Sequence, residues 1–154
     1  MDNNYKIFPG TYEHIEEIAS DIRKKFIPEY LWSGTNYFLE QIVENFNGKI
    51  LIAQNPYYFE EEGGSLSVFP DGTFVIKLSP ITLRFRDNFT IAHELGHYIL
   101  HFLVHKIKVE NEITIARYGS NNFESQANRF AAELLMPSEE ILDLINNGYD
   151  YSEI

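Results

Sequence analysis

The segment His93-Glu94-Leu95-Gly96-His97 holds two imidazoles and a carboxylate within five residues. On an α-helix, positions i and i+4 lie about 40° apart around the axis and one turn apart along it, so both rings can reach one tetrahedral ion. Glu94 then lies beside the pair, where it can take a proton from an attacking water and later pass it to the leaving amine. The segment predicts a zinc peptidase site, with His93 and His97 as metal ligands and Glu94 as the general base.

The surroundings of this segment bear on its interpretation, because so short a pattern also arises by chance. The two histidines could instead be core residues whose ring nitrogens are satisfied by hydrogen bonds. Their neighbours on the predicted helix are apolar: Ile91, Ala92, Leu95, Ile99 and Phe102. Imidazoles buried among such residues cost stability unless they are paired or ligated, which favours the metal site.

A catalytic zinc site needs a third protein ligand and one open position. The metzincin pattern would require glycine at position 100 and histidine at position 103, where this chain has Leu100 and Leu103. His101 lies about 12 Å along the helix axis from His93, too far for both to bind one ion in an unbroken helix. We therefore expect His101 to pack in the core or to support a ligand.

Glu124 is the better candidate for the third ligand. It opens a predicted helix with an apolar stripe formed by Phe123, Ala127, Phe130, Ala131 and Leu134. A carboxylate beside a buried stripe is costly unless a cation meets it. Asn128, one turn further on, could orient a ligand histidine through its free ring nitrogen. The alternative is that Glu124 is a solvated first-turn residue favoured by the helix dipole.

Two amphipathic helices are predicted before the motif. The first runs from Thr11, a plausible N-cap, to about residue 25, and the second from about residue 35 to residue 47, ended by Gly48. Their apolar residues recur at helical spacing: Ile15, Ile18, Ile22 and Phe26, then Phe38, Ile42 and Phe46.

The middle of the chain predicts strands. Residues 49–54 read as a short strand, and residues 65–69 and 73–78 flank the turn sequence Pro70-Asp71-Gly72 as a hairpin. If strand 73–78 is an outer strand bordering the zinc cleft, a substrate could add to it through main-chain hydrogen bonds. Alternatively, its Val75 and Ile76 simply pack the sheet on the helices.

The motif and ligand helices follow. Asp87 is the expected cap of a helix that reaches about residue 104, and Asn121 or Asn122 the expected cap of another that ends before Pro137. Ser138 could cap a last short helix to about residue 147. The predicted class is α+β, a small antiparallel-rich sheet flanked by helices.

Composition limits the classes of function. The 154 residues suit a single domain, 1–154, and contain no cysteine, so a metal must rest on histidine and carboxylate. A formal charge of -11 argues against direct nucleic-acid binding and favours a basic partner. Neither a signal-peptide pattern nor a membrane span is evident, which predicts a cytoplasmic protein with no membrane partner.

Residues 90–101 (TIAHELGHYILH) and residues 124–137 (ESQANRFAAELLMP) together resemble the ImmA/IrrE metallopeptidases. The resemblance implies a thermolysin-like zincin core with ligands His93, His97 and Glu124 and with Glu94 as the catalytic residue. It also implies a regulatory role, since members cleave helix-turn-helix repressors of mobile elements or stress genes.

Two functional hypotheses follow. The first is a zinc endopeptidase, with one Zn²⁺, that cuts a basic DNA-binding repressor, whose encounter the acidic surface would assist. The second is a non-proteolytic, zinc-containing binding module that sequesters such a regulator. Zinc suits two histidines and a carboxylate best, with an Fe(II) facial triad as the main rival. Arg117 and Tyr118, ahead of the ligand helix, are candidate donors to the oxyanion of the transition state.

Overall fold

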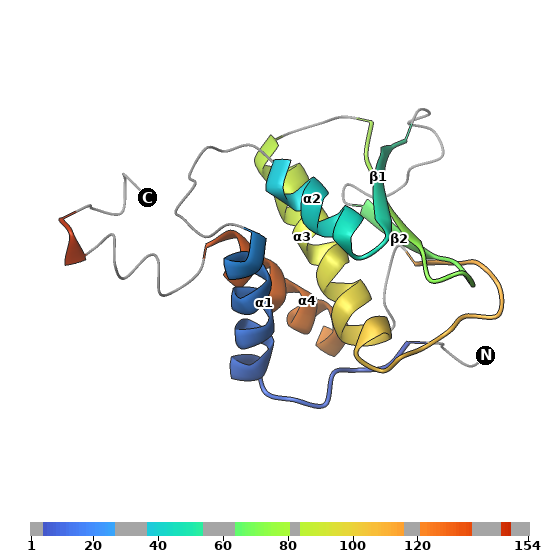
Figure 1. Cartoon of the computed structure of the whole chain (residues 1–154), viewed down its shortest axis with the longest axis horizontal. Coiled ribbons are helices and arrows are strands. Elements are labelled where there is room, and N and C mark those ends of the chain that lie inside the picture. The colour runs from blue at the N-terminus through green and yellow to red at the C-terminus, as the bar shows by residue number, and fades with distance from the viewer. Residues whose placement is uncertain are drawn as a thin grey trace.

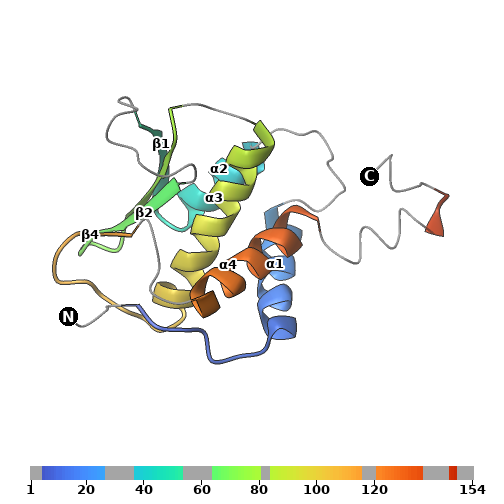
Figure 2. The same cartoon turned by 180° about the vertical axis from the view of Figure 1, so that it is seen from behind.

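The computed structural model describes residues 5–26, 37–53, 64–80, 84–115, 121–136 and 146–148. Within these residues the chain forms a four-stranded mixed sheet, four α-helices and one π-helical turn. Helices α2 and α3 lie against the sheet, α4 packs on the side of α3 away from the sheet, and α1 packs on α4 (Figures 1 and 2). The predicted α+β class with a small sheet and flanking helices is confirmed.

The first two helices agree with the sequence patterns. Helix α1 spans Tyr12–Phe26, and Thr11 Oγ1 accepts a hydrogen bond of 3.1 Å from His14 N, as expected of an N-cap. Helix α2 spans Tyr37–Asn45. Its predicted start near residue 35 lies outside the described residues.

The sheet has the strand order β1-β3-β2-β4. Strands β1 (Gly48–Ile52) and β3 (Phe74–Leu78) are parallel, whereas β2 (Gly64–Val68) pairs antiparallel with both β3 and β4 (Ile113–Ile115). The predicted hairpin is therefore present. Its turn uses Gly72 at a φ of 88°, a left-handed conformation that glycine adopts without strain.

Strand β3 corrects one sequence prediction. It is hydrogen-bonded to β1 on one side and to β2 on the other, so it has no free edge to which a substrate strand could add. The expectation that strand 73–78 is an outer strand is wrong. The alternative role is confirmed for Ile76, which is completely buried in the core under the helices, but not for Val75, which is half-buried and outside that core.

Strand β4 was not predicted from the sequence. Three residues are too few to show an alternating pattern, and the strand exists because it pairs with β2 from a distance of almost fifty residues. Ser67 Oγ and Thr114 Oγ1 form a hydrogen bond of 2.8 Å across this pair. Tertiary pairing, and not local propensity, defines this edge of the described sheet.

The motif helix α3 spans Arg84–Tyr98 and continues into a π-helical turn, η2, at Ile99–Leu103. The end of this helical segment agrees with the prediction, but its start does not. Asp87 is not the N-cap: it lies in the first turn, where the helix dipole favours a carboxylate. In η2, Val104 N donates to Ile99 O at 3.0 Å, the wider spacing of a π-turn.

Helix α4 spans Asn121–Leu135, within a residue of the predicted bounds. Its C-terminal carbonyls are partly satisfied by Arg23 of α1, whose Nη1 donates to Leu134 O at 2.7 Å. Most of the predicted last helix from Ser138 to about residue 147 lies outside the described residues.

Helices α3 and α4 approach each other closely at Gly96. A Cβ atom on Gly96 would lie 2.9 Å from Phe130 Cδ1 and 3.1 Å from Phe130 Cβ, closer than ordinary van der Waals contact. The fully buried Phe130 therefore rests directly on the backbone of α3. This contact brings the start of α4 up to the motif residues.

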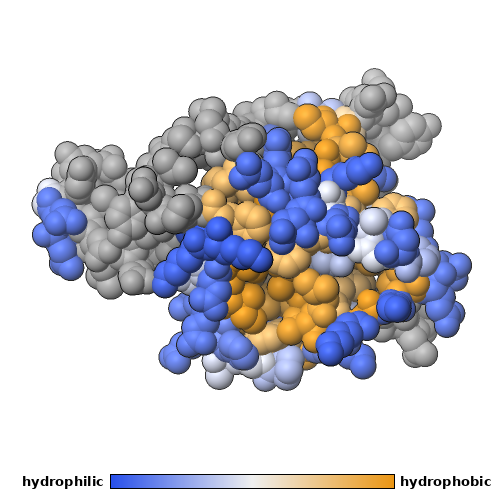
Figure 3. All heavy atoms as spheres, in the orientation of Figure 1, coloured by the Kyte–Doolittle hydropathy of each residue, from blue (hydrophilic) through white to orange (hydrophobic). Residues whose placement is uncertain are grey.

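The outer surface mixes hydrophilic and hydrophobic side chains, and Figure 3 shows hydrophobic ones gathered in the middle of one face with hydrophilic ones around them. Exposed large apolar residues occur on several elements, including Leu51, Phe89 and Val104. In the described part of the chain, no helix combines the length and the apolar character that crossing a membrane requires.

We predict that Gly96→Ala lowers the thermal stability of the protein. The added methyl group must displace Phe130, an overpacking cost of about 1–3 kcal/mol, against a gain in helix propensity of about 1 kcal/mol. Thermal unfolding would measure the net loss. Ser125→Ala, at an exposed position of α4, is the control and should leave the midpoint unchanged or slightly raised. A stabilised Gly96→Ala protein would contradict the close approach.

Candidate metal centre

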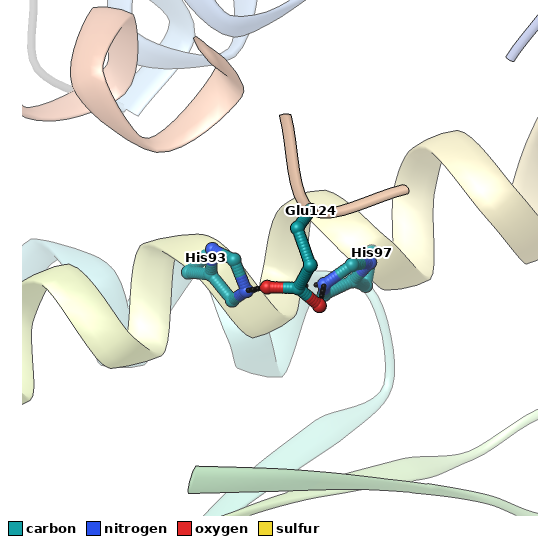
Figure 4. Close-up of side chains that lie close together, drawn as sticks. All are labelled: His93, His97 and Glu124. Atoms are coloured by element: carbon teal, nitrogen blue, oxygen red, sulfur yellow. Dashed lines mark hydrogen bonds and ion pairs between the residues drawn. The ribbon is translucent and has the colours of Figure 1, made fainter. Parts of the chain in front are cut away.

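Two histidines of α3 and one glutamate of α4 meet at the interface between these helices. Figure 4 shows the Glu124 carboxylate lying between the rings of His93 and His97. His93 Nε2 is 3.1 Å from His97 Nε2 and 3.0 Å from Glu124 Oε2, and His97 Nε2 is 3.2 Å from Glu124 Oε1. The structure thus brings together the three residues that the sequence proposed as ligands. Glu124 of α4 lies 27 residues beyond His97 of α3 in the chain.

The three ligand atoms fit one small cation. A tetrahedral site with metal–ligand distances of about 2.0–2.1 Å has edges of about 3.3 Å. The two Nε2 atoms are 3.1 Å apart, and each lies 3.0–3.2 Å from a different oxygen of the Glu124 carboxylate. Both histidines present Nε2, and the carboxylate supplies charge. With a metal bound, the three residues would supply three ligands and leave a fourth position for water or substrate.

Burial and hydrogen bonding set the charges of two of these groups. Burial lowers the pKa of His97 to about 3, so its ring is neutral and keeps a lone pair for a metal. Contacts with the His93 and His97 rings hold the pKa of Glu124 well below its usual range. Glu124 is therefore an ionised carboxylate, and not merely a solvated first-turn residue.

His93 lies nearer the surface than His97. Burial lowers its pKa, but the hydrogen bond to Glu124 and the charges of Glu94 and Glu124 outweigh burial and raise it overall. Asn128 makes the smallest of these contributions. His93 Nδ1 has no hydrogen-bond partner of ordinary geometry among the described residues, so Asn128 orients this ring only weakly.

Glu94 is buried beside the cluster, with only 3% of its surface exposed. Burial raises the pKa of its carboxyl group to about 8. Its Oε2 atom is buried and has no hydrogen-bond partner among the described residues, which is costly for a structural glutamate. A polar atom held in this way beside an open ligand position can serve a water or a substrate.

His101 lies one turn beyond His97 and does not join the ligand cluster, as expected. Its Nδ1 is 3.0 Å from His97 Nδ1, and its Nε2 is 2.9 Å from Gln126 Oε1. Gln126 was not predicted from the sequence. A signal was present, because Gln126 lies at i+3 from Phe123 and at i−4 from Phe130, on the buried face of α4.

Arg117 and Tyr118, the predicted donors to an oxyanion, lie outside the described residues. Their role stays a prediction.

Two histidines one turn apart, a carboxylate from a second helix and a buried glutamate beside them are the arrangement of a metal-dependent hydrolase site. The family model described as Peptidase_M78, the IrrE N-terminal-like domain, matches residues 49–154, well over half of the chain. The chain belongs to this family, which confirms the ImmA/IrrE resemblance and supports a metallopeptidase type of function. No curated protein matches the chain.

We predict that Zn²⁺ raises the thermal unfolding midpoint and that Glu124→Ala largely removes this rise. A ligand at a hundred times its dissociation constant stabilises by about 2.7 kcal/mol, which corresponds to several degrees for a chain of this size. Glu112→Gln, which removes one exposed acidic charge, is the control and should respond to zinc as the wild type does. An equal response from Glu124→Ala would contradict its assignment as a ligand.

Proposed function

We propose that the chain is a zinc-dependent endopeptidase with a thermolysin-like zincin core, in which His93, His97 and Glu124 hold one Zn²⁺ and Glu94 is the catalytic residue. The observation that carries this proposal is the meeting of two histidine Nε2 atoms, 3.1 Å apart, with a carboxylate whose oxygens lie 3.0 and 3.2 Å from them, beside a buried glutamate with an unpartnered oxygen. Membership in a peptidase family agrees with it.

The chain's own residues would divide the chemistry as follows. When bound, zinc supplies Lewis-acid chemistry, polarising the scissile carbonyl and lowering the pKa of a water molecule. Glu94 takes the proton of the attacking water on its buried oxygen and returns it to the leaving amine. A cation next to Glu94 favours the ionised carboxylate that this first step needs, and burial favours the protonated form that the second step needs.

Two imidazoles and one carboxylate suit zinc better than magnesium or calcium, which prefer oxygen ligands. The same three groups on one side of an ion also suit Fe(II), so iron is the main alternative. Elemental analysis of protein purified without added metal distinguishes the two.

The substrate we propose is a basic, helix-turn-helix repressor of a mobile element or a stress response. The support is the family and the formal charge of -11, which attracts basic surfaces and repels the phosphate backbone of DNA. In this proposal residues 1–154 act as one cytoplasmic domain without direct nucleic-acid or membrane contacts. The competing function is a zinc-containing module that binds and sequesters the same regulator without cutting it.

We predict that Glu94→Gln abolishes cleavage of the repressor encoded beside this gene while zinc stays bound. The amide keeps the shape of the side chain but cannot accept the proton of water, and loss of a general base lowers the rate by about 10²–10⁴-fold. Cleavage is followed by gel electrophoresis and mass spectrometry of the fragments, and zinc content by elemental analysis.

Two comparisons make this experiment decisive. Glu112→Gln carries the same chemical change at an exposed position and should cut at the wild-type rate. Wild-type rates from Glu94→Gln would remove the mechanism. A wild-type protein that binds the repressor tightly but never cuts it would favour sequestration, which Glu94→Gln should leave intact.

A further inference from the structure

A chain of buried hydrogen bonds connects the ligand His97 with the main chain near the N-terminus. It runs from His97 Nδ1 to His101 Nδ1 at 3.0 Å, and from His101 Nε2 to Gln126 Oε1 at 2.9 Å. Gln126 then forms two hydrogen bonds with the backbone of Phe8, which lies in the segment before α1. Three elements far apart in the sequence thus meet behind the metal cluster.

The backbone of Phe8 fixes the orientation of the Gln126 amide. Phe8 N, a donor, is 3.0 Å from Gln126 Oε1, and Phe8 O, an acceptor, is 2.8 Å from Gln126 Nε2. A flipped amide would place two donors together and two acceptors together. The oxygen of Gln126 must therefore face both Phe8 N and His101.

This orientation fixes the protons of His101. Because Gln126 Oε1 only accepts, His101 Nε2 must carry a hydrogen and donate it. His101 is completely buried, and burial favours a neutral imidazole, which has one ring hydrogen. His101 Nδ1 is then an acceptor, and the hydrogen in its contact with His97 Nδ1 must come from His97.

The last step reaches the metal ligand. With its hydrogen on Nδ1, a neutral His97 has its lone pair on Nε2, the atom that faces His93 and Glu124. We propose that Gln126 and His101 are positioning residues. The Phe8 backbone sets the orientation of Gln126, Gln126 sets the tautomer of His101, and His101 holds His97 in its metal-binding tautomer. The inference rests on the proposed metal site, and it makes the N-terminal segment a part of that site.

Packing keeps water from replacing this chain of bonds. Gln126 is 8% exposed, Phe8 5%, and His97 and His101 are fully buried. Phe123 packs edge-on against the His101 ring at 4.8 Å, and Lys6 N donates to His101 O at 3.0 Å, which ties the N-terminal segment to η2. Each polar group in this chain of hydrogen bonds is therefore paired with the next group and not with water.

Nitrogen-15 NMR of the full-length protein reads these tautomers directly, because protonated and unprotonated ring nitrogens differ widely in chemical shift. Spectra are recorded with zinc bound and after its removal by a chelator. We expect a hydrogen on His97 Nδ1 and on His101 Nε2 in both samples. If either ring changes its tautomer when zinc leaves, the metal and not the Phe8 amide sets it, and the proposal is overturned.

A double-mutant cycle tests whether Gln126 acts through His101. Gln126→Met removes the acceptor at similar volume and should weaken zinc binding about 10–100-fold, measured by competition with a chelator. In His101→Asn, the new amide oxygen can accept directly from His97 Nδ1 without help from residue 126. Adding Gln126→Met to His101→Asn should then change the affinity for zinc by less than about twofold.

The controls separate this role from general destabilisation. Ser125→Ala, beside Gln126 on the exposed face of α4, should bind zinc as the wild type does. If Gln126→Met lowers the affinity for zinc equally in the wild type and in His101→Asn, the role of Gln126 is merely structural and the proposal is overturned. If Gln126→Met does not fold, the wild-type spectra still decide. A wild type that binds no zinc would contradict the proposed function, whereas its tautomers would still support or overturn the proposed network.

Discussion

The structure depends on one close contact, the approach of α4 to α3 at Gly96. With no side chain at this position, Phe130 lies directly on the backbone of α3, and the first turn of α4 comes within reach of the motif histidines. Only then does the Glu124 carboxylate lie within 3.2 Å of both Nε2 atoms. Helix packing and ligand geometry are therefore one constraint, because a shift of either helix would change both.

Burial of this interface determines the chemistry of the groups within it. Loss of water keeps His97 neutral and raises the pKa of Glu94, while the adjacent His93 and His97 rings keep the pKa of Glu124 low and its carboxylate ionised. A neutral imidazole, an ionised ligand and a carboxyl group poised near neutrality are what a metal-dependent hydrolysis needs. The cost of burying so many polar groups is met by partners inside the core, which explains the continuous chain from His97 to Phe8.

Much of the fold followed from local patterns. Helical spacing of apolar residues located α1, α2 and α4, and a turn sequence with Gly72 located the hairpin, because each of these signals lies within a few consecutive residues. The errors concern long-range partners. The position of β3 inside the sheet depends on the parallel partner β1, and β4 exists only through its pairing with β2. No local pattern carries that information.

By itself, the sequence determined that His93 and His97 share one helical face with Glu94 beside them, because that geometry follows from the period of a helix. It also identified Glu124 as the best candidate for a third ligand. Only the tertiary structure decided that Glu124 reaches the two rings, and that Gln126 and Phe8 stand behind them. These contacts join segments up to 118 residues apart, and their formation depends on how helices pack rather than on spacing along the chain.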